Sequence, residues 1–309
     1  LLNKNKKKSQ IIDLIKKINP DIIRSFNPLL QGWMAAQVKQ ELGIPLVISL
    51  HGDYDRDLRY QSKKKHDYKG LLKLQISKQV LEKFSLSTAD EIIIIYEFIR
   101  EYAMKMGGTS INLIYNRVDL SKFSPKTKSE LKKIKPMIIC VGRLIKEKNQ
   151  ECLIRAIKDL DVKLLLVGNG VEYENLKDLV SSLKIDEKVE FETSIPHEKI
   201  HSYYASSDIF ALPIKYGGFA IPALEAAATG IPVILPKQEF DPNPDLIKDF
   251  ALLVDNNPKS FKDAIQKVLS DKSLRSDLIL NGLAVTKEIS SEIMEEKEKQ
   301  LYLKLLKKK

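Results

Sequence analysis

The sequence is poor in cysteine: Cys140 and Cys152 are the only two in 309 residues, and neither has a partner at a metal-binding spacing. We therefore expect two reduced, buried thiols and a reducing, cytoplasmic compartment. Long apolar runs are also missing, because the longest, such as residues 91–96, fall far short of the ~20 residues that span a bilayer. The lysine-rich start has no uninterrupted apolar core and does not resemble a signal peptide.

Acidic residues are outnumbered, since 51 Lys and Arg stand against 41 Asp and Glu, a net charge of +10. Lysines cluster at residues 4–8, 63–65 and 307–309. Such an excess suggests an anionic partner, and an ordinary solvated surface explains it equally well. The basic runs have no interleaved aromatic residues and match no nucleic-acid motif, so we do not expect nucleic acid as a partner.

The length predicts two domains, at roughly one domain per 100–200 residues. Short β-branched runs alternate with amphipathic stretches, which indicates parallel sheets covered by helices and therefore an α/β fold. In the first half we predict helices at residues 9–18, 29–42 and 68–86. The strands predicted there are residues 21–26, 46–50, 91–96 and 111–115.

Residues 124–136 are polar, rich in lysine and bounded by prolines, which is typical of a linker. The predicted domains are therefore residues 1–127 and 134–288, followed by a last charged helix at 289–309 with Ser290 or Ser291 as its N-cap. Six strands make the second domain a complete doubly wound unit. They are residues 137–141, 163–167, 189–191, 208–212, 232–235 and 251–254.

The first segment with chemical character follows the strand at 137–141. Gly142 and Arg143 come directly after it, at the carboxyl end where open α/β sheets bind ligands. A guanidinium holds phosphate oxygens bidentately and an ammonium adds a compact charge, so Arg143 and Lys148 suit a diphosphate. An ordinary surface loop with two cations is the alternative for this segment alone.

A second segment, residues 213–233, begins where another strand ends. Gly217 and Gly218 let the backbone approach a ligand, and an alanine-rich helix opens near Phe219 with free amides that favour an anion. Glu225 lies inside this apolar helix, where a carboxylate needs a hydrogen-bond partner. A ribose diol would supply two donors, and a core amide or cation is the alternative partner.

Other polar residues carry weaker signals. Gly168 and Gly170 end a strand but lack the third glycine of a dinucleotide fingerprint, so they suit a wall of a nucleotide site. His51 follows a strand in the first domain and is predicted to face the cleft, and a structural role at the strand end is the alternative. The acidic pairs around Asp53 and the pair His197 and His201 offer no recognisable set of metal ligands, and we expect no metal.

Four motifs stand in order along the chain: ADEIIIIYEF at residues 89–98, IYNRVD at 114–119, VGRL at 141–144 followed by Lys148, and GFAIPALEAA at 218–227. Together they resemble the GT-B glycosyltransferases of family 4, a retaining group that has a lysine at the position of Lys148, and the resemblance runs from about residue 20 to the end. The resemblance implies two Rossmann-like domains facing across a cleft, with the donor on the second and the acceptor on the first. It also implies that the first domain is incomplete, because residue 1 corresponds to a point inside that domain and the family's first strand and glycine-rich loop are absent, and that the last helix, 289–309, crosses back to the first domain.

The same resemblance assigns roles to residues of this chain. Arg143 and Lys148 neutralise the departing diphosphate, which is electrostatic catalysis without a metal, and His51 lies near the sugar. Glu225 binds ribose, and Ser194 and Ile195 read the base. The remaining donor-side residues are Gly142, Asn169, Gly170, Gly217, Gly218, Phe219, Ala220 and Ile221. The acceptor-side residues are Asp53, Arg56, Asn116 and Arg117.

Three positions depart from the family pattern. Gly217 stands eight residues before Glu225, where the family has a glutamate that contacts the donor sugar. Tyr96 replaces a usual serine, and Arg117 replaces a glycine. The predicted function is transfer of a hexose from a UDP- or GDP-sugar to a glycan or lipid-linked acceptor at the cytoplasmic membrane face. The alternatives are a non-catalytic nucleotide-binding protein and a sugar-nucleotide epimerase.

Overall fold

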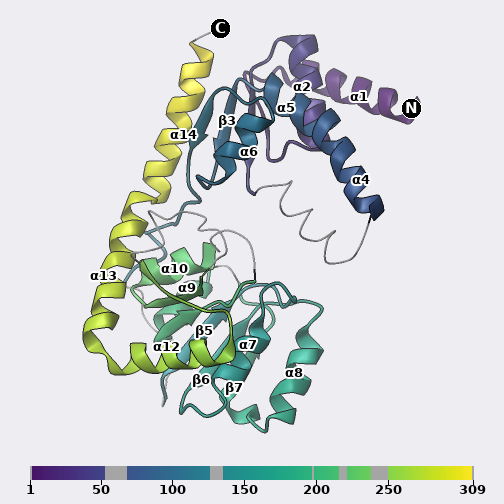
Figure 1. Ribbon diagram of the computed structural model, residues 1–309. Helices are drawn as coiled ribbons and strands as arrows, with labels where there is room; N and C mark the ends of the chain where they lie inside the picture. The colour runs from purple at the N-terminus through teal and green to yellow at the C-terminus, as the bar shows by residue number, and fades with distance from the viewer. Residues whose placement is uncertain are drawn as a thin grey trace. The chain divides into compact units, whose positions relative to one another are not determined.

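The computed structural model describes residues 2–52, 68–125, 135–196, 198–215, 221–237 and 250–307. The chain divides into two compact units, Leu1–Tyr115 with Met294–Lys309 and Asn116–Ile293 (Figure 1). Each unit is built on a sheet of parallel strands with helices between them. The prediction of two parallel-sheet α/β domains is therefore confirmed. No helix in the described ranges is long and apolar enough to cross a bilayer.

The first unit contains a four-stranded sheet in the order β1-β2-β3-β4, with every described pair parallel. Each of the four predicted strands is present, although β1, β3 and β4 are shorter than predicted. All five residues of β2 are buried, which fits an apolar strand covered on both faces. The bounds of the strands are β1 Ile23–Ser25, β2 Leu46–Leu50, β3 Glu91–Ile94 and β4 Ile111–Leu113.

The helices of this unit extend two of the predicted ranges. The first helix begins at Leu2 rather than at residue 9. Residues 2–8 include four lysines, which favour a helix, and they contain neither proline nor glycine. The predicted helix at 68–86 is a continuous run to Thr88 that includes a π-helical stretch, η1. The bounds are α1 Leu2–Ile18, α2 Leu30–Leu42, α4 Tyr68–Ser77, η1 Lys78–Glu82, α5 Lys83–Thr88 and α6 Ile99–Lys105.

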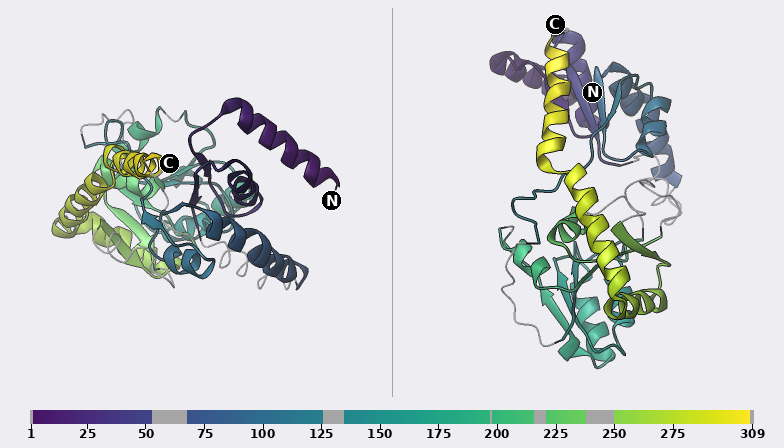
Figure 2. Two further views of the ribbon diagram at one scale, coloured as in Figure 1. Left: turned by 90° about the horizontal axis from the view of Figure 1, so that it is seen from above. Right: turned by 90° about the vertical axis from the view of Figure 1, so that its left-hand side faces the viewer.

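The last helix, α14 Ser291–Leu306, belongs to the first unit from Met294 onward. Arg24 of β1 forms an ion pair with Glu298 of this helix, and Lys304 lies 3.8 Å from the buried carboxylate of Glu91. In the right-hand view of Figure 2 the yellow helix runs beside the purple strands. The two ends of the chain therefore build one unit.

The second unit has a six-stranded parallel sheet in the order β10-β9-β8-β5-β6-β7, and all six predicted strands are present. The strands are β5 Met137–Val141, β6 Lys163–Val167, β7 Val189–Glu192, β8 Ile209–Ala211, β9 Val233–Pro236 and β10 Ala251–Val254. The helices are α7 Gln150–Ala156, α8 Tyr173–Ser182, η2 Asp186–Lys188, α9 Ile200–Ala205, α10 Ile221–Thr229, α12 Pro258–Ser270 and α13 Lys272–Glu288.

Local sequence explains where two of these helices begin. The Asn257 side chain accepts a hydrogen bond from the Ser260 amide at 2.9 Å, and Pro258 takes the first helical position of α12. Asp271 caps α13 in the same way, through the Leu274 amide at 3.0 Å. The first cap fixes the turn between β10 and α12, and the second fixes the turn between α12 and α13.

The contacts group residues 116–125 with the second unit, whereas the sequence-based boundary placed residues up to 127 in the first domain. Val118 forms an isolated parallel bridge with Ser290. Phe123 is buried and sets its ring edge-on to Tyr204, with 5.9 Å between the ring centroids. Residues 116–123, which precede the predicted linker, thus already belong to the second unit.

Candidate functional site

The strand order of the second unit creates a topological switch point between β5 and β8. From β5 the chain proceeds to β6 and β7 on one side, and β8, β9 and β10 follow on the other. Doubly wound sheets bind ligands at such a point, outside the carboxyl ends of the strands. The segments after β5 and β8 are the two that the sequence singled out.

After β5 the chain passes through Gly142 and Arg143 to Lys148. Arg143 is exposed and Lys148 is half-buried, with its aliphatic stem running past Gly142. Burial, and to a smaller extent the Arg143 charge, lowers the pKa of Lys148. Neither cation forms an ion pair with any residue in the described part of the chain. Two adjacent cations without anions favour an anionic ligand.

Gln150 anchors the backbone of this loop through a hydrogen bond. It is buried at the start of α7, and its side-chain amide donates to the carbonyl oxygen of Arg143 at 2.9 Å. The sequence gave no sign of this contact, because a glutamine in a helical stretch does not indicate its partner. The backbone that carries the guanidinium is therefore fixed, while its side chain faces solvent.

The two glycines after β6, Gly168 and Gly170, are required by close contacts with the backbone of the loop after β5. A Cβ on Gly168 would lie 2.2 Å from the Gly142 carbonyl oxygen, and one on Gly170 would lie 2.1 Å from that of Leu144. The Leu144 amide donates to the Asn169 carbonyl at 2.9 Å, so the two loops pack backbone to backbone. Asn169 itself is exposed, and its side-chain oxygen accepts from the Gly170 amide at 2.7 Å.

After β8 the chain comes back against the β5 loop, because the Lys215 amide donates to the Glu147 carbonyl oxygen at 2.8 Å. The predicted site residues Gly217, Gly218, Phe219 and Ala220 lie outside the described residues. The described part of the next helix, α10, begins at Ile221, which is exposed at its first turn. The amides expected to meet an anion thus lie in the stretch between Lys215 and Ile221.

Glu225 of α10 has a partner that sequence reasoning missed. It is half-buried, and its Oε2 accepts a hydrogen bond at 2.8 Å from the hydroxyl of Tyr204, a fully buried residue of α9. Burial, then the Glu225 charge, raises the pKa of Tyr204, so the phenol stays protonated and acts as the donor. The carboxylate is therefore oriented by a core hydroxyl.

Ser194 and Ile195 follow β7, the outermost strand on this side. Ser194 is exposed and Ile195 is half-buried. Four neighbouring strands thus place candidate residues along one edge, from β8 through β5 and β6 to β7. At roughly 4.8 Å between strands this row is about 14 Å long, which suits an elongated ligand.

The remaining predicted residues divide between the units. His51 follows β2 in the first unit, and its ring lies 5.8 Å from that of Phe26. Partial burial, and then the Arg24 charge, lowers its pKa. Asn116 and the exposed Arg117 group with the second unit, although we assigned them to the acceptor side. Asp53 and Arg56 lie outside the described residues.

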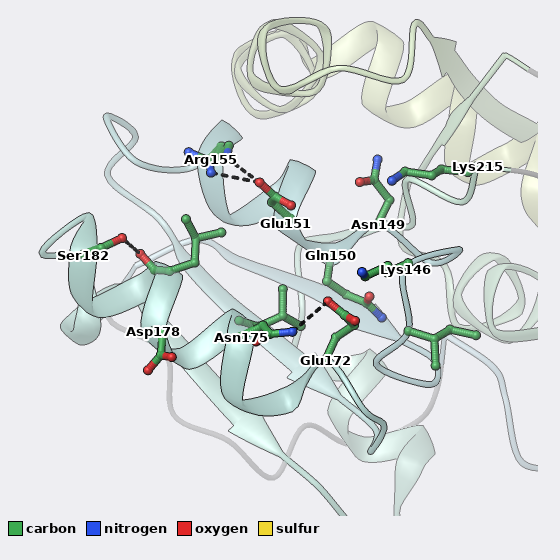
Figure 3. Close-up of a pocket in the computed structure, with 13 residues that line it drawn as sticks. Lys146, Asn149, Gln150, Glu151, Arg155, Glu172, Asn175, Asp178, Ser182 and Lys215 are labelled. Carbon is green, nitrogen blue, oxygen red and sulfur yellow. Dashed lines mark hydrogen bonds and ion pairs between the residues drawn. The ribbon is translucent and has the colours of Figure 1, made fainter. Parts of the chain in front are cut away.

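A groove of about 460 Å³ between α7 and α8 is a further feature of this unit (Figure 3). Lys146, Asn149 and Lys215 line one end of it, and Arg155 and Ser182 line the other. Arg143, Lys148 and Glu225 do not line it. Across the described ranges, no three His, Cys, Asp or Glu side chains are grouped as metal ligands. Both cysteines are free and buried, as predicted.

Two parallel-sheet α/β units, one with a complete doubly wound order, define the GT-B class of fold, and solved structures share it. Sucrose-phosphate synthase from Thermosynechococcus elongatus matches with a TM-score of 0.83 at 24% identity, over 99% of this chain and 78% of that one. The HepE protein of Anabaena, solved in complex with UDP, matches with a TM-score of 0.76 at 17% identity, over 95% and 81%.

The chain belongs to the glycosyltransferase family described as "Glycosyl transferases group 1", whose model matches residues 122–284. A second model, "Glycosyltransferase Family 4", matches residues 4–122. The resemblance inferred from the four motifs is confirmed.

Two relatives show how far the similarity extends. A GDP-mannose-dependent alpha-(1-6)-phosphatidylinositol monomannoside mannosyltransferase of Mycolicibacterium smegmatis is 36% identical over 32% of this chain and 29% of its own length. An uncharacterized glycosyltransferase of Methanocaldococcus jannaschii is 24% identical over 91% and 74%. The match thus spans less than a third of the first relative and about three quarters of the second.

Proposed function

We propose that this protein transfers a hexose from a UDP- or GDP-sugar to a glycan or lipid-linked acceptor, with retention of configuration. The observation that carries the proposal is the pair Arg143 and Lys148, two cations that lack ion pairs with any described residue, at the switch point of a doubly wound sheet. A diphosphate placed there meets a bidentate guanidinium and a compact ammonium. Family membership supports the same assignment.

In this proposal the two cations stabilise the negative charge that develops on the leaving diphosphate. Glu225, oriented by Tyr204, holds a ribose hydroxyl through its carboxylate. Ser194 and Ile195 lie at the base end of the row, and His51 acts near the sugar, as the family resemblance implies. Because the protein's own cations supply the charge, we expect transfer to proceed without a metal.

The direct test incubates the purified protein with UDP- and GDP-linked glucose, galactose, N-acetylglucosamine and mannose, with and without EDTA. We expect release of UDP or GDP with one sugar, a slow rate without acceptor, and no change with EDTA. The anomeric configuration of the product, read by NMR, tests retention. Release that stops with EDTA and returns with Mg²⁺ contradicts the metal-free mechanism.

A second candidate is a non-catalytic protein that binds a nucleotide sugar, favoured by Gly217 at the position of the family's sugar-contacting glutamate. It predicts donor binding by calorimetry with no release of diphosphate over hours. An epimerase instead predicts a changed sugar that is still joined to its nucleotide. The NMR spectrum of the sugar nucleotide would then change while its mass stays the same. The same incubation therefore separates all three.

We also propose that the protein docks on an anionic membrane surface at the cytoplasmic face. In the sequence this proposal depends on the basic stretch from Lys63 to Lys73 with Arg56 and Arg59, of which residues 53–67 lie outside the described part of the chain. The continuous helical run of α4 and η1 carries an apolar stripe of residues four positions apart, Leu72, Ile76 and Val80, each more than half exposed. Figure 1 shows α4 leading away from the four-stranded sheet. Exposed Lys69 and Lys83 flank the stripe, the arrangement of an interfacial helix.

The test is co-sedimentation with vesicles of phosphatidylcholine alone and with added phosphatidylglycerol. We expect binding that requires the anionic lipid and weakens with salt, because each surface cation contributes about 1 kcal/mol. Ile76→Ser should release the protein, whereas Leu280→Ser, an exposed apolar residue of α13, should not. Equal binding to neutral vesicles, or no effect of Ile76→Ser, contradicts this surface.

A further inference from the structure

Three loops at the carboxyl edge of the second unit meet at one side chain, Asn256, which follows β10. Its Nδ2 donates to the carbonyl oxygens of Pro213 at 3.1 Å and Ile214 at 3.0 Å, both in the loop after β8. Its Oδ1 accepts from the Nδ2 of Asn149, at 3.0 Å, in the loop after β5. Because carbonyl oxygens only accept, the orientation of the Asn256 amide is fixed.

Asn149 is the other half of this contact, and its backbone is unusual. It lies in the left-handed region, with φ 56° and ψ 36°, directly after Lys148 and before the first residue of α7. Glycine is the ordinary choice for this conformation, and asparagine is among the few residues with a side chain that tolerate it. Here the side chain is used, since it reaches Asn256.

A backbone contact reinforces the same junction. The Lys215 amide donates to the Glu147 carbonyl oxygen, one residue before Lys148. Figure 3 shows Asn149 and Lys215 together at one end of the groove, with Gln150 beside them. The loop that carries Arg143 and Lys148 is thus tied to the chain just before residues 216–220.

We propose that Asn149 and Asn256 form a positioning pair that fixes the Arg143–Lys148 loop against residues 213–215, so that the two cations are held where they meet the donor diphosphate. This inference rests on the proposed function. Neither asparagine touches the diphosphate; each acts through the loops it joins. Small displacements of such groups, of about 1 Å, lower transition-state or ligand stabilisation strongly.

The pair is suited to positioning rather than to holding the fold together. Asn256 is exposed and Asn149 is half-buried, so water replaces their mutual hydrogen bond at little cost to folding. The strands that precede these loops pair independently of the two side chains, β5 with β8 and β9 with β10, and β8 and β9 are fully buried. Loss of the pair should therefore change ligand binding more than thermal stability.

The test uses the whole chain with Asn256→Ala, Asn149→Gly and the double substitution. Glycine at 149 keeps the left-handed turn and removes only the side chain. Dissociation constants are measured for UDP and GDP, and for uridine and guanosine by ligand-observed NMR, with a melting curve for each variant. Asn175→Ala is the control, because Asn175 lines the same groove but bonds to Glu172 and joins no loops.

We expect Asn256→Ala to weaken diphosphate binding by about tenfold, with nucleoside binding and the melting midpoint nearly unchanged. In the Asn256→Ala background, Asn149→Gly should add almost nothing, because the two side chains act as a unit. Unchanged diphosphate affinity in Asn256→Ala, or an equal loss for diphosphate and nucleoside, overturns the inference. A wild-type protein that binds neither UDP nor GDP overturns the proposed function and this inference with it.

Discussion

Single side chains at the carboxyl edge of the second sheet carry the chemistry proposed for this chain. Arg143 is exposed, its backbone is held by Gln150, and no described carboxylate pairs with its guanidinium. Lys148 beside it has a pKa that burial lowers. A charged group kept this way does little for folding, so its role is best tested by ligand binding.

Arg143→Ala should weaken UDP or GDP binding while leaving the fold intact. The guanidinium would make charge-assisted hydrogen bonds worth about 1.5–3 kcal/mol, so the dissociation constant should rise roughly tenfold to hundredfold. Isothermal calorimetry measures the affinity, and a melting curve checks the fold. Lys146→Ala, another exposed cation of the same loop, is the control. Equal affinities for wild type and Arg143→Ala would remove Arg143 from the site.

His51 should titrate below its ordinary pKa of 6.5, because partial burial and the Arg24 charge disfavour the imidazolium. The stability contributed by the neutral ring is then present above pH 6.5 and lost as the pH falls through 6.5 toward the folded pKa. NMR titration of the four histidines, with His51→Gln for assignment, gives the value. Arg24→Gln should raise it. A midpoint at or above 6.5 would count against this environment.

At the scale of elements, the loops after β5 and β6 act as one packed layer. Residues 142–144 lie against residues 168–170. Backbone carbonyl oxygens of the first loop occupy the space that a Cβ on Gly168 or Gly170 would need. The sequence predicted Gly168 and Gly170 as a wall of a nucleotide site. Hydrophobic periodicity could not reveal that these two glycines also permit the close contact between the two loops. Such close approaches depend on which strands become neighbours.

Gly170→Ala should destabilise the protein by about 1–3 kcal/mol, as an overpacked core substitution does, because the added Cβ would lie 2.1 Å from the Leu144 carbonyl oxygen. Urea denaturation measures the loss. Nucleotide affinity should fall in the same variant, since the shift moves the loop that carries Arg143. Lys146→Ala, on the same loop but exposed, should leave the denaturation midpoint in place. A stable variant with normal affinity would show that the loops separate freely.

At the scale of the whole molecule, the two units use the chain differently. The second is continuous, and the first combines the beginning of the chain with α14 from its end. Arg24 and Glu298 join these distant segments, and the Glu298 carboxylate also accepts from Tyr302 at 2.6 Å. The first unit therefore depends on contacts that span almost the entire sequence.

Glu298→Ala should lower the stability of the first unit by about 1–3 kcal/mol, because it leaves the partly buried Arg24 without this carboxylate. Trp33 of α2 is the only tryptophan, so its fluorescence reports unfolding of that unit. Glu296→Ala, an exposed neighbour on the same helix, is the control and should leave the fluorescence midpoint unchanged. Identical midpoints for the two variants would show that the ion pair contributes nothing.

Sequence alone predicted the strands and the parallel α/β class, because apolar runs and glycine turns are local features. It also predicted the family, because four family motifs occur in order along the chain. It also placed Arg143 and Lys148 at a strand end. Only the tertiary structure brought Tyr204 to Glu225, Gln150 to Arg143 and Asn256 to the loops after β5 and β8. These partners lie 7 to 107 positions apart in the chain, and folding of the sheet, rather than any local pattern, decides that they meet.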